Sequence, residues 1–137
     1  HSTNIYQHYE RNHFIENLWF VMRYIYHKNP KMGKALIEYM KSKTYYPANM
    51  FIAKKKVIDE YAEWLFAVLF AVDEDMDFNH FELNASHKIS GDTWEYQRRA
   101  PAYIAERLFS FWLWYNKDRY KVISKPIVMY EKGYDEI

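Results

Sequence analysis

Residues 49–72 read NMFIAKKKVIDEYAEWLFAVLFAV and contain the longest amphipathic helical pattern in the chain. Phe66 and Phe70 widen its apolar stripe, so we expect more than half of the helix circumference to be buried. The preceding residues 50–53 are apolar as well, which favours a short buried strand over a plain lead-in to the helix. The stripe itself follows the three- and four-residue spacing of one helical face and comprises Val57, Ile58, Tyr61, Trp64, Leu65, Val68, Leu69 and Val72.

Three shorter helices are predicted before this stretch. Ser2 or Thr3 is suited to cap a helix that runs to about residue 11 and turns Ile5 and Tyr9 inward. Residues 15–26 and 32–40 predict an antiparallel helical hairpin, because the residue before a proline is disfavoured in the helical region and Asn29-Pro30 separates the two patterns. The side chains expected to face inward are Leu18, Trp19, Met22, Ile25 and Tyr26 in the first helix of the hairpin, and Leu36, Ile37 and Met40 in the second.

The C-terminal part predicts one more helix and one strand. The helix opens at Pro101, a natural first-turn residue, and carries a stripe of Ile104, Leu108, Phe111, Trp112 and Tyr115 to about residue 116. Residues 121–130 favour a strand, which Pro126 places at an edge or a bulge. The predicted fold is mainly α (α+β), with about five helices and one or two short strands in a single domain over residues 1–137.

Composition narrows the classes of function. The chain has 137 residues, of which 50% are hydrophobic and 20% aromatic, enough for a core without staples. Its net charge of +1 lacks the basic excess of nucleic-acid binding proteins. Cysteine is absent, which excludes disulfides and fits a reducing compartment. We find no secretory signal and no apolar run of roughly 20 residues, so we expect a cytoplasmic protein. From the charge balance we expect no nucleic-acid partner.

Metal chemistry finds little support in the sequence. Asp75-Met76-Asp77 is an Asp-x-Asp pattern of the kind that binds Mg²⁺ or Mn²⁺, yet it follows a helix end, and we interpret it as a solvated helix stop. The six histidines include no His-x₃-His pair, so we expect no metal site and no cofactor in this chain. His13 is the histidine of interest, because it closes the first helix beside Glu16.

Basic residues precede two of the predicted helices. Lysines fill positions 54–56, and Arg98-Arg99 lies just before the Pro101 helix. Free backbone donors at a helix start, with a cation alongside, suit a phosphate. For the lysines we favour plain solvation. The two arginines follow the aromatic residues Trp94 and Tyr96, and either one offers a bidentate fork to a diphosphate.

Glu106 and Arg107 follow one to two turns into the Pro101 helix. Their neighbours face the core, so Glu106 is expected at a rim, where a carboxylate is a candidate general base. On sequence alone, an ordinary exposed helix pair is the favoured interpretation. Aromatic side chains that suit stacking on a sugar ring gather near the breaks between elements, and these are Tyr45, Tyr46, Trp94, Tyr96 and Tyr103.

Taken together, these motifs resemble a known bacterial family. Residues 49–52, the lysine-rich turn and DEYAEWLF at 59–66, followed by YIAERLFSFWL at 103–113, are similar to a family that carries a domain-of-unknown-function label. Members of that family are described as capsular or exopolysaccharide glycosyltransferases. The similarity covers residues 3–131 and includes the segment 6–13, Asn29-Pro30 and KPIV at 125–128.

The resemblance implies a nucleotide-sugar-dependent transferase with a Rossmann-like (GT-A) fold. It implies that this chain matches the C-terminal half of the family domain, so that donor binding lies in an N-terminal half. The chain also begins with His rather than Met, which we interpret as a sign of an excised piece. The piece alone is then expected to be inactive. Its partners would be a nucleotide-sugar donor and a glycan or lipid-linked acceptor, with Mg²⁺ or Mn²⁺ in the complete enzyme, peripheral association with the inner face of the membrane, and a homodimer through an exposed face.

By analogy with related sugar transferases, Glu106 would lie near the acceptor hydroxyl as the catalytic base. Asn49 would face the acceptor from a strand tip, and Arg99 and Arg107 would bind the diphosphate or hold Glu106. The full set of residues predicted to bind substrate is His13, Tyr46, Asn49, Trp94, Tyr96, Arg98, Arg99, Tyr103 and Arg107.

A second hypothesis comes from a different class. A helical domain with this many aromatic residues also suits a non-catalytic module that binds a partner protein through exposed aromatic side chains.

Overall fold

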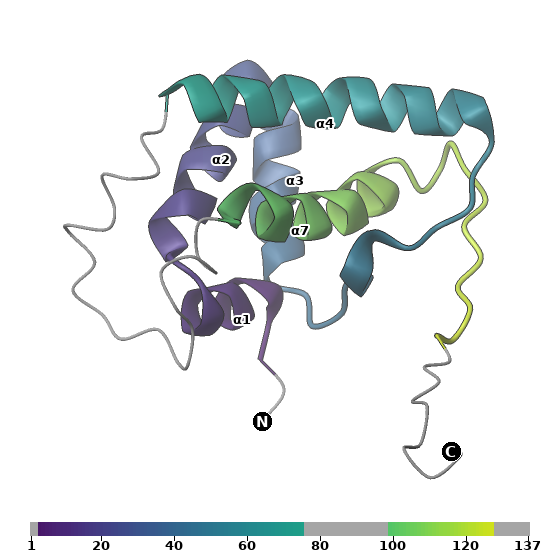
Figure 1. Cartoon of the computed structure of the whole chain (residues 1–137), viewed down its shortest axis with the longest axis horizontal. Coiled ribbons are helices and arrows are strands. Elements are labelled where there is room, and N and C mark those ends of the chain that lie inside the picture. Colours follow the sequence, from purple (N-terminus) through teal and green to yellow (C-terminus); the bar gives the residue numbers. More distant parts are fainter. Residues whose placement is uncertain (1–2, 76–98, 128–137) are drawn as a thin grey trace, which may run out of the picture.

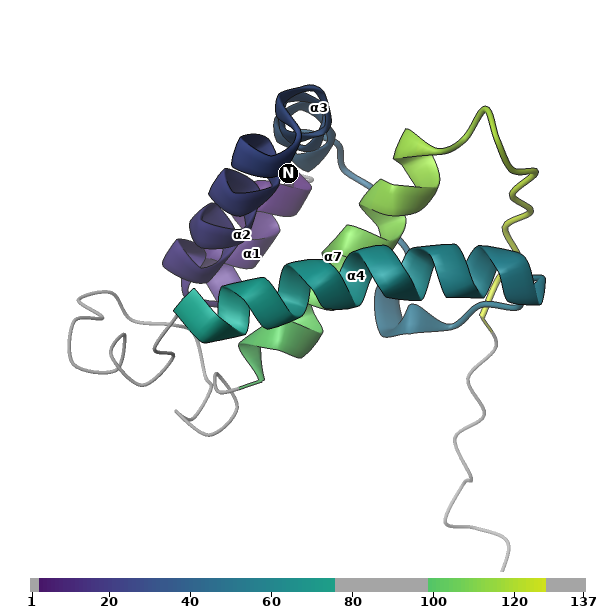
Figure 2. The same ribbon diagram turned by 90° about the horizontal axis from the view of Figure 1, so that it is seen from above.

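The computed structural model describes residues 3–75 and 99–127, and these ranges are mainly α-helical, as predicted (Figure 1). The helix α4 lies along one side of the molecule, and α7 runs beneath it, next to the pair α2 and α3 (Figure 2). The elements are α1 (Ile5–Asn12), α2 (Ile15–Lys28), α3 (Pro30–Met40), the short 3₁₀ helix η1 (Pro47–Asn49), α4 (Lys55–Asp75) and α7 (Ala100–Tyr115).

The short strands of the prediction are wrong within the described ranges, where no strand forms. Residues 50–53 are irregular rather than a buried strand, and Ile52 is 103% exposed. Residues 121–127 are likewise irregular and exposed along their whole length, and 128–130 lie outside the description. Apolar composition alone therefore mispredicted both segments, because a strand also needs a partner for its backbone groups.

The helical hairpin is confirmed. Asn29 ends α2 and caps α3, since its side chain accepts a hydrogen bond from the Met32 backbone amide at 3.1 Å. Gly33 permits the close approach of the two helices: a Cβ at this position would lie 2.4 Å from the Cα of Tyr26. Any side chain at residue 33 would therefore push the hairpin apart.

The inward face of the hairpin was only partly predicted. The buried residues Leu18, Ile25, Leu36 and Met40 confirm the pattern, and Met22 packs against the core while partly buried. Three bulky residues expected inside are instead exposed, and these are Trp19, Tyr26 and Ile37. Trp19 turns outward to donate a hydrogen bond from its indole Nε1 to the Tyr6 hydroxyl at 2.7 Å.

Helix α1 begins with a capping box. The Asn4 side chain accepts from the Gln7 backbone amide at 2.7 Å, and the Gln7 side chain accepts from the Asn4 amide at 3.2 Å. The predicted cap at Ser2 or Thr3 is therefore wrong, whereas the inward positions of Ile5 and Tyr9 are confirmed.

Helix α4 buries a narrower face than predicted. Tyr61, Leu65 and Val68 lie in the core, but Phe66 and Phe70 are 49% and 64% exposed and stack on one another at 5.6 Å between ring centroids. Trp64 and Leu69 are partly buried, and Ile58 is exposed. No helix in the described part of the chain is long and apolar enough to cross a bilayer.

Helix α7 is the most enclosed element, and it positions the site described next. It packs against α4, α3 and η1. Ile104, Leu108, Phe111 and Trp112 are buried, as the predicted stripe requires. Its polar residues Arg107 and Ser110 are also buried, which the apolar stripe did not indicate.

Candidate functional site

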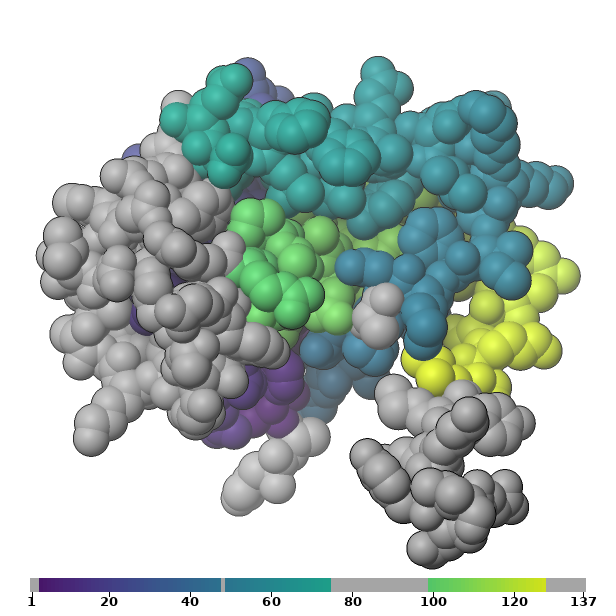
Figure 3. All heavy atoms as spheres, viewed as in Figure 1, coloured from purple at the N-terminus to yellow at the C-terminus, as the bar shows by residue number. Residues whose placement is uncertain are grey.

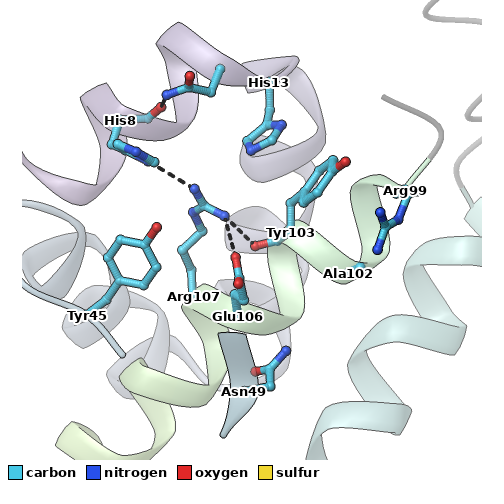
Figure 4. Close-up of a pocket in the computed structure, with 10 residues that line it drawn as sticks. His8, His13, Tyr45, Asn49, Arg99, Ala102, Tyr103, Glu106 and Arg107 are labelled. Carbon is cyan, nitrogen blue, oxygen red and sulfur yellow. Dashed lines mark hydrogen bonds and ion pairs between the residues drawn. The ribbon is translucent and has the colours of Figure 1, made fainter. Parts of the chain in front are cut away.

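A polar cavity of about 510 Å³ opens at the first turns of α7, facing α1 and the segment 45–49 (Figure 4). Six of the residues predicted to act in catalysis or substrate binding line it together, and these are His13, Asn49, Arg99, Tyr103, Glu106 and Arg107. The remaining lining residues are His8, Asn12, Tyr45 and Ala102. The structure thus gathers residues that lie up to about a hundred positions apart in the chain.

Arg107 forms the centre of this site, although it is only 1% exposed. Its Nη1 donates to the Tyr103 carbonyl at 2.8 Å and lies 3.4 Å from Oε2 of Glu106. Its Nη2 is 3.1 Å from Nδ1 of His8. The guanidinium also lies over the rings of Tyr9, at 4.9 Å, and Tyr45, at 5.2 Å. Figure 4 shows the guanidinium between α1 and α7.

The positive charge of Arg107 is incompletely compensated by the described residues. A buried cation is costly unless it is paired and fully hydrogen-bonded. The ion pair with Glu106 is long, at 3.4 Å, and the described residues offer no acceptor to the buried Nε. The cavity therefore favours a ligand group that accepts hydrogen bonds or carries negative charge.

Glu106 lies at the rim of the cavity, as predicted, with 25% of its side chain exposed. Nη1 of Arg107 lies 3.4 Å from one of its carboxylate oxygens, and Glu106 contributes to the lining of the cavity. The interpretation of residues 106 and 107 as an ordinary exposed pair is wrong, because Arg107 is buried. Neighbouring positions on α7 thus place a cation inside and a carboxylate at the opening.

His8 is the site residue that sequence reasoning missed. A guanidinium can only donate, so the contact with Arg107 requires Nδ1 of His8 to accept and the ring to be neutral, with its proton on Nε2. Burial lowers the pKa of His8, the charge of Arg107 lowers it further, and Glu106 opposes that shift. The contact spans 99 positions, so no local spacing indicated it.

His13 is buried and stacks on Tyr103, with ring centroids 4.0 Å apart and an angle of 19° between the rings. It follows the last residue of α1, where its backbone amide donates to the Tyr9 carbonyl. The predicted position at the end of the first helix is confirmed. Together, His13 and Tyr103 form an aromatic wall of the cavity.

Asn49 lines the cavity from the end of η1 rather than from a strand tip. The φ of Asn49 is 49°, in the left-handed region. Among the described residues, Asn49 is the one non-glycine residue with a positive φ. Asparagine tolerates this conformation better than most residues. The prediction of a strand here is wrong, but Asn49 does face the site.

Arg99 precedes α7 directly and lines the cavity while remaining exposed. Trp94, Tyr96 and Arg98, which were predicted to bind substrate with it, lie outside the described residues. So does Asp77 of the Asp-x-Asp pattern.

Tyr46 does not line this cavity. It lines a second cavity, of about 560 Å³, together with Tyr39, Trp114 and Lys117. Tyr45 belongs to the walls of both cavities, so the two lie next to each other. The Tyr46 hydroxyl pairs with the Ser124 hydroxyl at 2.5 Å, and its backbone amide donates to Ser110 Oγ at 2.7 Å.

Within residues 3–75 and 99–127, no group of three or more His, Asp or Glu side chains is arranged to bind a metal ion. Acidic side chains occupy the last turn of α4, which extends to Asp75, three residues beyond the predicted end at Val72. The expectation of a divalent metal in the complete enzyme stays a prediction.

The fold and the site define a helical domain with a polar cavity in which a buried arginine holds a carboxylate at the rim. Residues 1–117 match the family model described as a domain of unknown function (DUF4422), and the chain belongs to this family. No curated protein and no solved structure matches the chain.

Proposed function

We propose that this chain is the acceptor-side part of a nucleotide-sugar-dependent glycosyltransferase that builds capsular polysaccharide, exopolysaccharide or lipopolysaccharide. The observation that carries the proposal is the position of Glu106, a carboxylate held at a cavity rim by a buried guanidinium. The motif resemblance around residues 49–66 and 103–113 supports the reaction class.

In the proposed reaction, the Glu106 carboxylate accepts the proton of an acceptor hydroxyl. The oxygen then forms a bond to the anomeric carbon of the donor sugar, while the bond from that carbon to the diphosphate oxygen breaks. The nucleoside diphosphate leaves with the electron pair. A positioned general base typically contributes about 10²–10⁴-fold to the rate of such a step.

The contacts assign different roles to the two arginines of the cavity. Arg107 is buried and already contacts Glu106, His8 and a backbone carbonyl, so its role is to hold the base. Arg99 is exposed at the start of α7 and offers a bidentate fork, so it is the better candidate for the donor diphosphate. Asn49, Tyr103 and His13 would then surround the acceptor sugar.

The second cavity suits the next sugar of the acceptor. It adjoins the first through Tyr45, and Tyr46 and Trp114 present partly exposed aromatic faces there. Aromatic faces of this kind stack on sugar rings. In this proposal an acceptor glycan lies across Tyr45, with its reactive end at Glu106.

The proposal carries the remaining expectations with it. The donor would be a nucleotide sugar and the acceptor a glycan or lipid-linked glycan, in the cytoplasm. Mg²⁺ or Mn²⁺ in the complete enzyme would neutralise negative charge on the leaving diphosphate. The isolated chain would be inactive where the donor-binding half is missing.

The substitution Glu106→Gln tests the role of the base. In the protein that carries this chain, the rate of sugar transfer from UDP- or GDP-sugars should fall by about 10²–10⁴-fold, while the circular dichroism spectrum stays unchanged. The matched control is Glu63→Gln, an exposed carboxylate on α4, which should leave the rate intact. Wild-type turnover by Glu106→Gln would refute the role of Glu106. Failure of every nucleotide sugar in the panel to protect the protein thermally would refute the class.

A specific observation also favours the second candidate, a non-catalytic interaction module. Phe66 and Phe70 form a stacked, exposed aromatic pair on α4 and do not line the cavity. In that case Phe66→Ser with Phe70→Ser should abolish a homodimer detected by analytical ultracentrifugation, and no nucleotide sugar should bind. A monomer that binds a nucleotide sugar would refute this candidate.

A further inference from the structure

One end of the molecule combines exposed apolar side chains with lysines, and we name residues 50–58 and 121–127 the basic–apolar end. These two segments lie side by side in Figures 1 and 2, and Figure 3 shows them as adjoining blue and yellow surfaces. Hydrogen bonds flank the contact: Ser124 pairs with Tyr46, and Arg119 donates to Glu60 at 2.8 Å. Two segments about 70 positions apart therefore form one surface.

Most of the apolar side chains of this end are exposed rather than packed in the core. Phe51 stacks on Phe109 at 4.5 Å between ring centroids and anchors the loop. The following residue, Ile52, is left 103% exposed, and Ile123 on the other segment is 66% exposed. Met50, Ile58, Val122 and Ile127 are exposed as well. Single exposed apolar residues are ordinary, but a contiguous group marks an interaction site.

The charge of this end has one sign. Its two segments contain Lys54, Lys55, Lys56, Lys121 and Lys125 and no acidic residue, although the whole chain carries a net charge of only +1. All five lysines are exposed. Three of them lie at or next to the start of α4, where the helix dipole disfavours positive charge. Lys55 forms an exposed ion pair with Asp59, one turn further along the helix, so the net contribution of these lysines to the helix is small. Their placement suits an external negative surface.

We propose that the basic–apolar end binds the surface of an anionic lipid bilayer, with Ile52 and Ile123 entering the interface and the lysines contacting the headgroups. Interfacial binding of this kind combines buried apolar area with attraction to anionic lipid. A protein partner would need acidic, shape-matched contacts, whereas a bilayer accepts two irregular, exposed segments as they are. The inference goes beyond the proposed sugar transfer and is tested without any nucleotide sugar.

The experiment is co-sedimentation of the full chain with phosphatidylcholine vesicles prepared with and without phosphatidylglycerol. We expect binding to the anionic vesicles that weakens as salt is added, and little binding to pure phosphatidylcholine. Ile52→Ser with Ile123→Ser should lower the partition coefficient by at least about tenfold. Replacing Lys54, Lys55 and Lys56 by Gln should lower it by about a hundredfold and remove most of the salt dependence.

Matched controls come from surfaces outside this end. Phe70→Ser removes an apolar side chain about as exposed as Ile123 from the C-terminal part of α4. Replacing Lys31, Lys34 and Lys41 by Gln removes three lysines from in and around α3. Both control variants should bind vesicles as the unmodified chain does. All the substituted side chains are exposed, and unchanged circular dichroism verifies folding.

Three outcomes would overturn the proposal. The first is absence of binding to anionic vesicles. The second is binding that the control variants lose as strongly as the test variants. The third is a homodimer that dissociates on Ile52→Ser with Ile123→Ser, which would make this end a contact between two copies of the chain.

Discussion

The cavity centred on Arg107 and the basic–apolar end both gather positive charge, in opposite environments. Arg107 is 1% exposed and contacts a carboxylate, a carbonyl and an imidazole. Lys55 has a side chain that is 88% exposed, and its ion pair is with Asp59, one turn away on the same helix, at 2.5 Å. Arg107 is packed inside the fold, whereas Lys55 lies on its surface.

The difference teaches how burial changes what a cation does. A buried guanidinium with unmet hydrogen-bonding capacity constrains its neighbours and attracts a complementary group from the cavity. An exposed ammonium is hydrated, screened by salt and free to meet any negative surface. Substitutions at the two places should therefore change different observables, and by different amounts.

The largest effect on stability is expected from Arg107→Met. The substitution removes a buried charge and the hydrogen bonds of its guanidinium, so that Nδ1 of His8 loses the Arg107 donor. We expect a loss of about 1–3 kcal/mol in the free energy of unfolding, measured by urea denaturation, because a polar group left without its hydrogen-bond partner costs about that much. Arg119→Met is the matched control, because its side chain is 58% exposed and its ion pair with Glu60 is on the surface, so the loss there should be below about 1 kcal/mol. Equal losses in the two variants would show that burial of Arg107 makes no difference.

A smaller effect is expected from pH, through His8. The folded state binds the neutral ring, so its pKa is lower than in the unfolded chain, where it is near 6.5. Neutral His8 makes its full contribution to the stability of the fold above the pKa of the unfolded chain. This contribution is lost as the pH falls from the unfolded pKa through the lower folded pKa, because the unfolded state binds a proton that the folded state binds less readily. The free energy of unfolding should therefore decrease on acidification below about pH 6.5.

The variant His8→Gln separates this contribution from other acid effects. Glutamine retains an acceptor for the Arg107 guanidinium but does not titrate. We expect stability close to that of the unmodified chain at neutral pH and a shallower decrease between neutral pH and about pH 5. His27→Gln, on the exposed end of α2, is the control. An unchanged pH profile for His8→Gln would contradict the neutral-acceptor assignment.

The sequence allowed the helices to be predicted, because apolar spacing and the proline-marked boundaries at Asn29-Pro30 and Pro101 act within a few residues. It also allowed six residues of the cavity to be named, since the motifs around Asn49 and Glu106 prove to be neighbours in space. Burial of Arg107 could not be predicted, because a local pattern assigns arginine to the surface. His8 was missed for the same reason: its contact is made across the whole chain.

The failures at the other end of the molecule have a different physical cause. Residues 50–53 and 121–127 have strand-like composition, yet the described chain supplies no backbone partner to pair with them. Phe66 and Phe70 match the helical period closely enough to be assigned to the core, but they lie on an exposed face of α4, whereas Val68 and Val72 on the same stretch are buried. Hydrophobicity indicates what prefers to be buried, and the surrounding fold decides how much of it is.

The smallest effect on stability is expected from Lys55→Gln. The ion pair with Asp59 is exposed on both sides, and the lysine lies at a helix start, where its charge opposes the dipole. These two contributions nearly cancel, so the free energy of unfolding should change by less than about 0.5 kcal/mol. Binding to anionic vesicles should nevertheless weaken about fivefold, as expected for one lysine near a charged bilayer. Removal of Lys55 should thus change membrane association but not folding, which is the opposite of what we expect for Arg107. A loss of stability in Lys55→Gln without a loss of vesicle binding would contradict this difference.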